Sequence, residues 1–329
     1  MKLNDSTSLL VPTFNRPTEL KRLLGYLNIY GEGSRIVIAD SSTAENKKEN
    51  EKIISNMNNL NIKYVNDYPQ DTHPSIKFHD MCKYSTEYSV FCGDDDLMSI
   101  RGINMCTDFL KENKNYSAAH GYFIKYQVQP KLTWWHEIYL TKISESDNPL
   151  ERMLFNFGSY IATFYDVHRT KHIEMTMGEV PIYSKGDSFD EVLRSLLDSI
   201  YGKIKMLPVT YCMREKAMTY KDIGQGDAIS ISKSIDNGTY KDIYPKWKSC
   251  LIKHLKDKIN ENEDIIGKKI DRGMKSYLRG NSEKIARHNF TEEDVNDVEI
   301  ALKFASNHEN IQEMIWSRDR NAFMETKKL

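Results

Sequence analysis

The sequence predicts an α/β fold, with a mostly parallel, doubly wound sheet and a helical C-terminal subdomain. Short apolar runs alternate with segments of helical spacing over roughly the first 125 residues, which is typical of parallel sheets. Three of these runs end in polar loops, at the sheet edge where such folds bind ligands. The final third is polar and mostly helical in pattern. We expect one α/β domain over residues 1–228 and a helical subdomain over residues 229–329.

Each element of the α/β part has its own signal. The apolar run "SLLV" is stopped by Pro12, and the leucines of "ELKRLL" then follow a helical spacing behind Pro17, which suits a first helical turn. The β-branched run "SRIVIAD" is typical of a buried strand and ends in an acid. In chain order we expect strands at 8–11, 34–40, 62–65, 88–92 and 117–123, with helices between them that include 75–84 and 101–111.

The second half of the chain is less regular. Apolar residues between 189 and 200 follow a clean helical period, and "KIKMLPVTY" behind them has the composition of a strand. The stretch "KLTWWHEIYL" has no clear period, and its two tryptophans fit sugar stacking or core packing equally. Beyond residue 230 the spacing is mostly helical, which is the basis of the predicted subdomain.

Charge and cysteine content argue against several classes of protein. Lys plus Arg (46) nearly balance Asp plus Glu (47), so we expect no nucleic acid partner. The five cysteines are odd in number and form no C-x-x-C pair, which disfavours a disulfide scaffold or a zinc ribbon. The N-terminus lacks the apolar core of a signal peptide, and no run of about 18 apolar residues occurs. These observations predict a cytoplasmic protein.

Three adjacent aspartates, Asp94, Asp95 and Asp96, follow the predicted strand at 88–92. Side by side they repel, and each gains from a cation or from water. Alone, the triplet is equally an acidic loop, a helix N-cap or a site for Mg2+ or Mn2+, which prefer carboxylate oxygens. Asp40 ends a neighbouring strand of the same predicted sheet, so two acidic sites converge on one crevice and favour the ligand site.

The loop "PTFNRP" offers backbone amides, the Thr13 hydroxyl, Asn15 and Arg16, all able to meet a phosphate or a nucleobase. The alternative is a plain turn before an N-capped helix. No G-x-x-x-x-G-K-[ST] occurs, and "GEGSR" falls short of G-x-G-x-x-G, so P-loop and dinucleotide-binding functions lose their main support.

Together, "SLLVPTFNRPTELKRLL", "IVIADSS", "TEYSVFCGDDDL" and a later acid-rich helix resemble the GT-A nucleotide-sugar glycosyltransferases, in the family-two-like group of inverting enzymes. Within that group the chain is similar to a bacterial subgroup with a Cys-x-Asp-Asp-Asp strand end. The resemblance is good over about residues 6–125, fair to about 220 and absent beyond. It implies transfer of a sugar from a nucleotide donor, most often a UDP-sugar, to a hydroxyl of a glycan or lipid-linked glycan in bacterial surface polysaccharide synthesis.

The resemblance also implies roles for residues near the donor. The loop residues Pro12, Thr13, Asn15 and Arg16 would wrap the nucleotide, Asp40 would accept the nucleobase imide proton, and Lys77 would lie near the diphosphate. The aspartates would be the D-x-D element that holds Mn2+ or Mg2+. Asp96 is expected to bind the metal, and its partner at the metal and ribose is either Asp94 or Asp95, because Gly93 stands where the family usually has an aspartate.

Inverting transfer needs a carboxylate that takes the proton of the attacking hydroxyl. The family has an acidic pair at a helix start about 95 residues beyond the D-x-D, where this chain reads "KGDSFDEVLRSLL". The candidates are Asp187, Asp190 and Glu191, and position favours the last two without choosing between them. Without the resemblance, acids in a first helical turn are explained equally well by the helix dipole. Arg214 would meet the diphosphate or an anionic acceptor, or is a surface arginine.

Other readings stay open. The stretch "YKDIYPKWKSCLIKHLKDKI" is either a helix packed on the rest of the protein or a basic amphipathic helix in peripheral contact with a membrane. A catalytically silent nucleotide- or glycan-binding scaffold would keep the same fold. A sugar nucleotidyltransferase is disfavoured because its Gly-rich N-terminal phosphate loop is missing.

Overall fold

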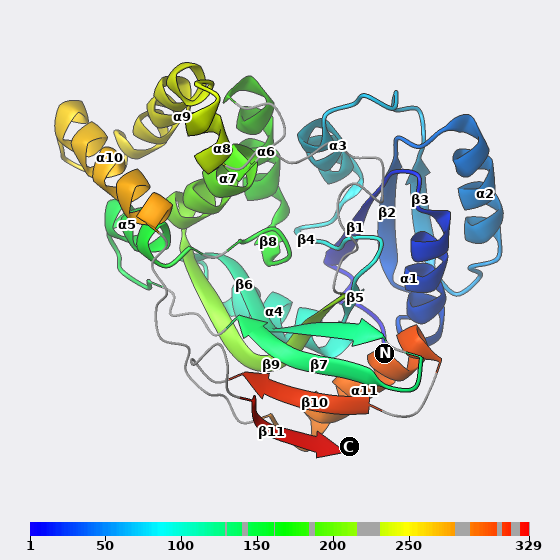
Figure 1. Cartoon of the computed structure of the whole chain (residues 1–329). Coiled ribbons are helices and arrows are strands. Elements are labelled where there is room, and N and C mark those ends of the chain that lie inside the picture. The colour runs from blue at the N-terminus through cyan, green and yellow to red at the C-terminus, as the bar shows by residue number, and fades with distance from the viewer. Residues whose placement is uncertain are drawn as a thin grey trace.

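The computed structural model describes most of the chain, namely residues 1–128, 130–139, 144–160, 162–183, 188–215, 231–279, 290–307, 311–316 and 323–328. These residues form one curved sheet with helices on both faces of its N-terminal part and a separate group of helices beside it (Figure 1). The α/β fold class predicted from the sequence is confirmed.

The N-terminal part alternates strand and helix as expected. Its elements are β1 Thr7–Thr13, α1 Pro17–Tyr30, β2 Arg35–Asp40, α2 Ala44–Ser55, β3 Asn61–Val65, α3 Pro74–Met81, the 3-10 turn η1 Cys82–Tyr84, β4 Tyr88–Phe91, β5 Leu97–Met98 and α4 Ile100–Glu112. The strand order β4-β1-β2-β3 is parallel throughout. Parallel neighbours end at the same edge of a sheet, so the loops after β1, β2 and β4 are brought together.

Both faces of this parallel part are buried. Along β1, Leu9 and Val11 pack into the core beneath α1 and α4, whereas Leu10 joins a smaller cluster that includes Met81 from α3. Successive side chains of a strand point to opposite faces, so a strand buried on both sides reads as a continuous apolar run. This is why "SLLV" and "RIVIAD" show no alternation.

The rest of the sheet is mixed in direction. It is built by β6 Tyr116–Val128, β7 Thr133–Tyr139, β8 Val167–Arg169 and β9 Lys203–Glu215. Strand β6 is antiparallel to β7 and β8 and parallel to β9, and it extends further than the expected 117–123. Strand β5 pairs antiparallel with the end of β9, with Leu97 opposite Met213. That pairing places Asp96 beside the carboxyl end of β9.

Six helices form a second core beside the sheet, at the left of Figure 1. They are α5 Pro149–Gly158, α6 Thr170–Tyr183, α7 Ser188–Tyr201, α8 Ile231–Asp236, α9 Tyr240–Leu255 and α10 Glu263–Arg279. On α9, Trp247 and Leu251 are fully buried in this core. The apolar side of the basic stretch thus packs against other helices, while contact with a membrane stays a prediction. None of the helices in the described part of the chain combines the length and the apolar character that a membrane crossing requires.

The C-terminal end returns to the sheet, which the helical pattern did not predict. After α11 Glu292–Ser306, strands β10 Ile311–Trp316 and β11 Phe323–Lys328 extend the sheet beyond β7, at the lower edge of Figure 1. The division at residue 228 stays a prediction, because the helical part expected beyond it is present but two strands from it complete the sheet. A short edge strand is defined by its neighbour more than by its own sequence.

One buried carboxylate fastens α11 to the sheet. Asp294 is 1% exposed, closes a capping box with Thr291, accepts a hydrogen bond from the Thr210 N–H at 2.8 Å and pairs with Arg101 at 2.7 Å. Asp294→Ala would leave these donors without an acceptor, and we expect a loss of about 2–4 kcal/mol in the free energy of unfolding.

Urea denaturation measures this loss, and Glu293→Ala is the matched control. Glu293 meets the same arginine but is 79% exposed, so its removal is expected to change stability by less than about 0.5 kcal/mol. Similar losses in both variants would contradict the anchoring role of Asp294.

Candidate active site

The loops that follow β1, β2 and β4 are bound to one another at the carboxyl edge of the parallel strands. The Thr13 hydroxyl donates to Asp94 Oδ2 at 2.7 Å, which joins the ends of β1 and β4. The Asn15 N–H donates to Ser42 Oγ at 2.7 Å, which joins the loops after β1 and β2. The convergence that the sequence predicted for these loops is present.

Asn15 shapes the loop after β1. Its φ of 55° lies in the left-handed region, which asparagine adopts more readily than most residues. Its side-chain oxygen accepts hydrogen bonds from the Thr43 N–H at 2.9 Å and from the Asn46 amide at 3.0 Å. Asn15 therefore ties its loop to the start of α2.

Arg16 spans two of the aspartates. One guanidinium nitrogen lies 2.9 Å from Asp94 Oδ1 and the other 2.8 Å from Asp95 Oδ2. The guanidinium fork suits two carboxylates at once. Asp94 is 4% exposed, and burial raises its pKa to about 7, an effect that Arg16 opposes.

Asp40 and Lys77 lie at the end of β2. Asp40 is fully buried and accepts hydrogen bonds from the Ser42 N–H at 2.7 Å, the Asn50 amide at 2.7 Å and the Tyr64 hydroxyl at 2.6 Å. A carboxylate with three donors is held in a fixed orientation. The nucleobase contact assigned to it by resemblance stays a prediction.

Lys77 on α3 bridges two loops. Its ammonium donates to Ser41 Oγ at 2.8 Å and to the Thr13 carbonyl at 3.3 Å, and it is 4% exposed. Burial lowers the pKa of Lys77 to about 8, with the carboxylates of Asp40 and Asp94 acting in the opposite direction. The group is mostly charged at pH 7, so a buried cation lies where the loops after β1 and β2 meet.

Asp96 faces β9 rather than the β1 loop. Its carboxylate accepts hydrogen bonds from the Tyr165 hydroxyl at 2.6 Å and the Glu215 N–H at 3.2 Å, and Arg214 Nε lies 3.4 Å away. Burial raises the pKa of Asp96 to about 6, and Asp95 adds to this effect. The Arg214 guanidinium also stacks over the Tyr165 ring at 4.7 Å. Arg214 thus belongs to the site.

Gly93 is closely surrounded by side-chain oxygens of the site. A Cβ at this position would lie 2.9 Å from Asp95 Oδ1, 3.0 Å from the Tyr165 hydroxyl oxygen and 3.3 Å from Asp96 Oδ2. A side chain here would crowd these three oxygens, which favours glycine at this position. Carboxylate oxygens are ligands that Mg2+ and Mn2+ prefer, and Asp95 and Asp96 each bring one close to Gly93, so these two residues fit such an ion.

The acids at the start of α7 differ in their surroundings. Asp190 Oδ2 lies 3.3 Å from His73 Nε2, and both side chains are mostly buried. His73 Nδ1 accepts the Ser75 N–H at 3.2 Å, which leaves the hydrogen of the neutral ring on Nε2, facing Asp190. Glu191 is exposed and accepts a hydrogen bond from the Tyr160 hydroxyl at 3.0 Å. Asp187 lies outside the described residues.

Helix α3 connects Asp190 to the strand-end loops. His73 is the N-cap of α3, and Lys77 follows one turn later on the same helix. His73, Tyr165 and the ion pair between Arg22 and Glu215 (2.6 Å) are the parts of the site that the sequence did not reveal. Each lies outside a recognisable motif, and only the tertiary fold brings it in.

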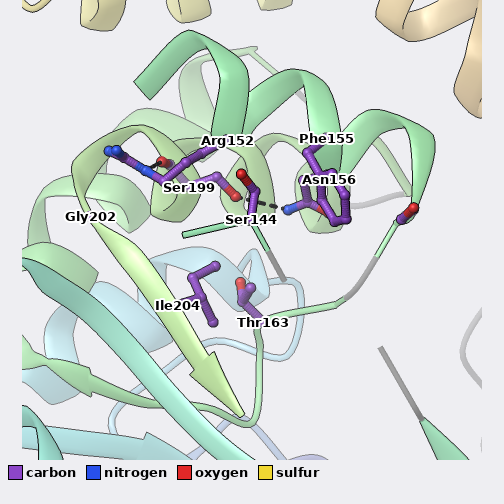
Figure 2. Close-up of a pocket in the computed structure, with 9 residues that line it drawn as sticks. Ser144, Arg152, Phe155, Asn156, Thr163, Ser199, Gly202 and Ile204 are labelled. Atoms are coloured by element: carbon purple, nitrogen blue, oxygen red, sulfur yellow. Dashed lines mark hydrogen bonds between the residues drawn. The ribbon is translucent and has the colours of Figure 1, made fainter. Parts of the chain in front are cut away.

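A separate pocket lies at the opposite end of β9 (Figure 2). Figure 2 shows Asn156, which donates to Ser199 Oγ at 3.0 Å, and Ile204 from the beginning of β9. None of its lining residues belongs to the loops after β1, β2 or β4. This pocket is not part of the strand-end site.

Comparison with known proteins identifies the class of fold. The sequence matches no protein-family model and no curated protein. The structure of S. aureus TarS 1–349 in complex with UDP-GlcNAc is 15% identical to this chain, with 84% of this chain and 72% of that chain covered and a TM-score of 0.50. This likeness shows that the chain has the fold of a nucleotide-sugar glycosyltransferase.

A second solved structure is more distant. The mannosyltransferase PcManGT from Pyrobaculum calidifontis, in complex with GDP-Man and Mn2+, is 12% identical, with 92% of this chain and 87% of that chain covered and a TM-score of 0.45. A score at this level adds nothing to the argument. The fold assignment thus depends on TarS and on the strand order described above.

Proposed function

We propose that the chain is a metal-dependent, inverting glycosyltransferase of the GT-A, family-two-like group. It would move a sugar from a nucleotide donor, most simply a UDP-sugar, to a hydroxyl of a glycan or lipid-linked glycan in bacterial surface polysaccharide synthesis. The observation that carries the proposal is the junction of three strand-end loops, where Arg16, Lys77 and Arg214 stand among the aspartates. The TarS-like fold supports it.

The cations are suited to the donor diphosphate. Lys77 is held between the loops after β1 and β2, and Arg16 and Arg214 approach from the two sides of the aspartates. Cationic groups that stabilise the departing diphosphate lower the barrier to transfer. The backbone and side chains of residues 12–16 would hold the nucleoside, together with Asp40.

Asp95 and Asp96 are the residues that we propose would hold Mn2+ or Mg2+. Asp95 Oδ1 and Asp96 Oδ2 both approach the Cβ position of Gly93, at 2.9 and 3.3 Å. Asp94, one of the two partners expected for Asp96, is engaged by both Thr13 and Arg16, which supports a role in fixing the donor loop. When bound, the ion would neutralise charge that develops on the diphosphate.

Asp190 is the proposed general base. The acceptor hydroxyl oxygen attacks the anomeric carbon, the bond to the diphosphate breaks with its electron pair, and the hydroxyl proton passes to the Asp190 carboxylate. His73 supports this assignment because its Nε2 lies 3.3 Å from Asp190 Oδ2, and α3 leads from His73 to Lys77. Glu191, which is exposed and bound to Tyr160, lacks such a link.

A thermal-shift screen of nucleotide sugars with and without Mn2+ tests the proposal. A ligand that binds the native state stabilises it and therefore raises Tm. The stabilisation is about 2.7 kcal/mol when the free ligand concentration is a hundred times Kd. We expect a UDP-sugar with Mn2+ to raise Tm more than either alone. If no nucleotide sugar shifts Tm in the presence of Mn2+ or Mg2+, the proposal fails.

Release of nucleotide diphosphate separates the enzyme from a silent scaffold. The donor that shifts Tm is incubated with Mn2+ and with water as the simplest acceptor. A transferase is expected to release the diphosphate slowly, whereas a scaffold would bind the donor without turnover.

A further inference from the structure

Three side chains with metal-ligand chemistry lie close together in the helical part of the molecule. They belong to α6 and α9, which lie outside the strand-end loops (Figure 1). Within the described part of the chain, Glu179, Cys250 and His254 are the one group of three such residues whose ligand atoms all lie within 4.8 Å of one another. Glu179 belongs to α6. Cys250 and His254 are four residues apart on α9 and therefore share one face of that helix.

The contacts within this group are close. Glu179 Oε1 lies 3.5 Å from His254 Nε2, and Glu179 Oε2 lies 4.0 Å from Cys250 Sγ. His254 is 9% exposed, and its Nε2 atom makes no hydrogen bond to any residue that the structure describes. A buried imidazole nitrogen is thus aimed at a carboxylate and a thiol without a hydrogen bond of its own.

We propose that Glu179, Cys250 and His254 bind Zn2+ or a similar divalent transition-metal ion, with water as the fourth ligand. A thiolate with an imidazole favours Zn2+ over Mg2+ and Mn2+, and a carboxylate completes a common three-residue set. On binding, the thiol proton of Cys250 leaves to solvent and the sulfur becomes a metal ligand. This site is independent of the proposed glycosyltransferase function.

His254 has a hydrogen-bond partner outside the three proposed metal ligands. The Tyr201 hydroxyl and His254 Nδ1 are hydrogen-bonded. When Nδ1–H donates to the tyrosine oxygen, the Nε2 lone pair is directed toward the ion, and such outer partners are the rule for metal-binding histidines. Tyr201 ends α7, so the ion would join α6 and α9 next to a third helix.

Lys253 competes with the ion for the Glu179 carboxylate. Its ammonium lies 2.7 Å from Glu179 Oε1, and its side chain is 56% exposed. An exposed lysine can turn into solvent at little cost because its charge is then hydrated. Lys253→Ala is therefore expected to tighten metal binding.

Cobalt substitution of the metal-free full-length protein tests the site. Co2+ bound to a thiolate gives a near-ultraviolet charge-transfer band that oxygen ligands do not give, so the strand-end aspartates cannot mimic it. We expect the band in the wild-type protein at one equivalent of Co2+, its loss on adding Zn2+ and its persistence with excess Mn2+.

Variants assign the band to these residues. Cys250→Ser is expected to abolish it, whereas Cys82→Ser, which alters another buried cysteine, is expected to retain it. Tyr201→Phe is expected to weaken Co2+ binding by about 10- to 100-fold. The proposal is overturned if the folded wild-type protein shows no such band, or if the band survives Cys250→Ser.

Discussion

Asp190→Asn is expected to lower kcat for sugar transfer by about a hundred- to ten-thousandfold, the range that a general base contributes. The amide keeps the shape of the side chain beside His73 but cannot take up the hydroxyl proton. The Kd for the donor is expected to change little, because the contact of Asp190 with His73 lies at the start of α3 and not in the strand-end loops. Release of nucleotide diphosphate from the donor measures kcat, and thermal shift measures donor binding.

Glu191→Gln is the matched control for this variant. The two acids are adjacent on α7, but Glu191 is exposed and contacts Tyr160. We expect its kcat to stay near the wild-type value. A wild-type rate in Asp190→Asn together with a large loss in Glu191→Gln would assign the base to Glu191 instead.

Asp96→Asn is expected to lower kcat by about a hundred- to a thousandfold, because it weakens the binding of the divalent ion that would stabilise the departing diphosphate. The Tyr165 hydroxyl donates to Oδ2 and the Glu215 N–H to Oδ1, so the amide oxygen of the variant keeps one of these two hydrogen bonds while the overall shape of the side chain is retained. A thermal melt checks that the variant is folded. The same variant is expected to need more Mn2+ for half-maximal activity.

The three aspartate variants together identify the metal pair. Asp95→Asn and Asp96→Asn are expected to raise the Mn2+ concentration required, whereas Asp94→Asn is expected to raise the donor KM because it releases Arg16 and Thr13. A Mn2+ requirement that changes in Asp94→Asn but not in Asp95→Asn would restore Asp94 as the partner of Asp96.

The sequence predicted the parts of the fold and site that local patterns encode. Buried strands such as β2 are visible as β-branched runs, and the loops that follow them converge because parallel strands share an edge. Strands β10 and β11 were missed because pairing defines them, β10 with β7 and β11 with β10. His73 and Tyr165 were missed for a similar reason, since each reaches its acid only through the packing of distant segments.

The ion pairs of Arg16 with Asp94 and Asp95 affect how metal and donor bind to the site. In the protein alone, arginines pair with all four nearby acids: Arg16 with Asp94 and Asp95, Arg22 with Glu215, and Arg214 with Asp96. A dication that takes over carboxylates from this set frees guanidinium groups to turn toward an incoming anion. Bound metal would then raise the affinity for the diphosphate, and bound diphosphate the affinity for the metal. We therefore expect the two ligands to bind cooperatively.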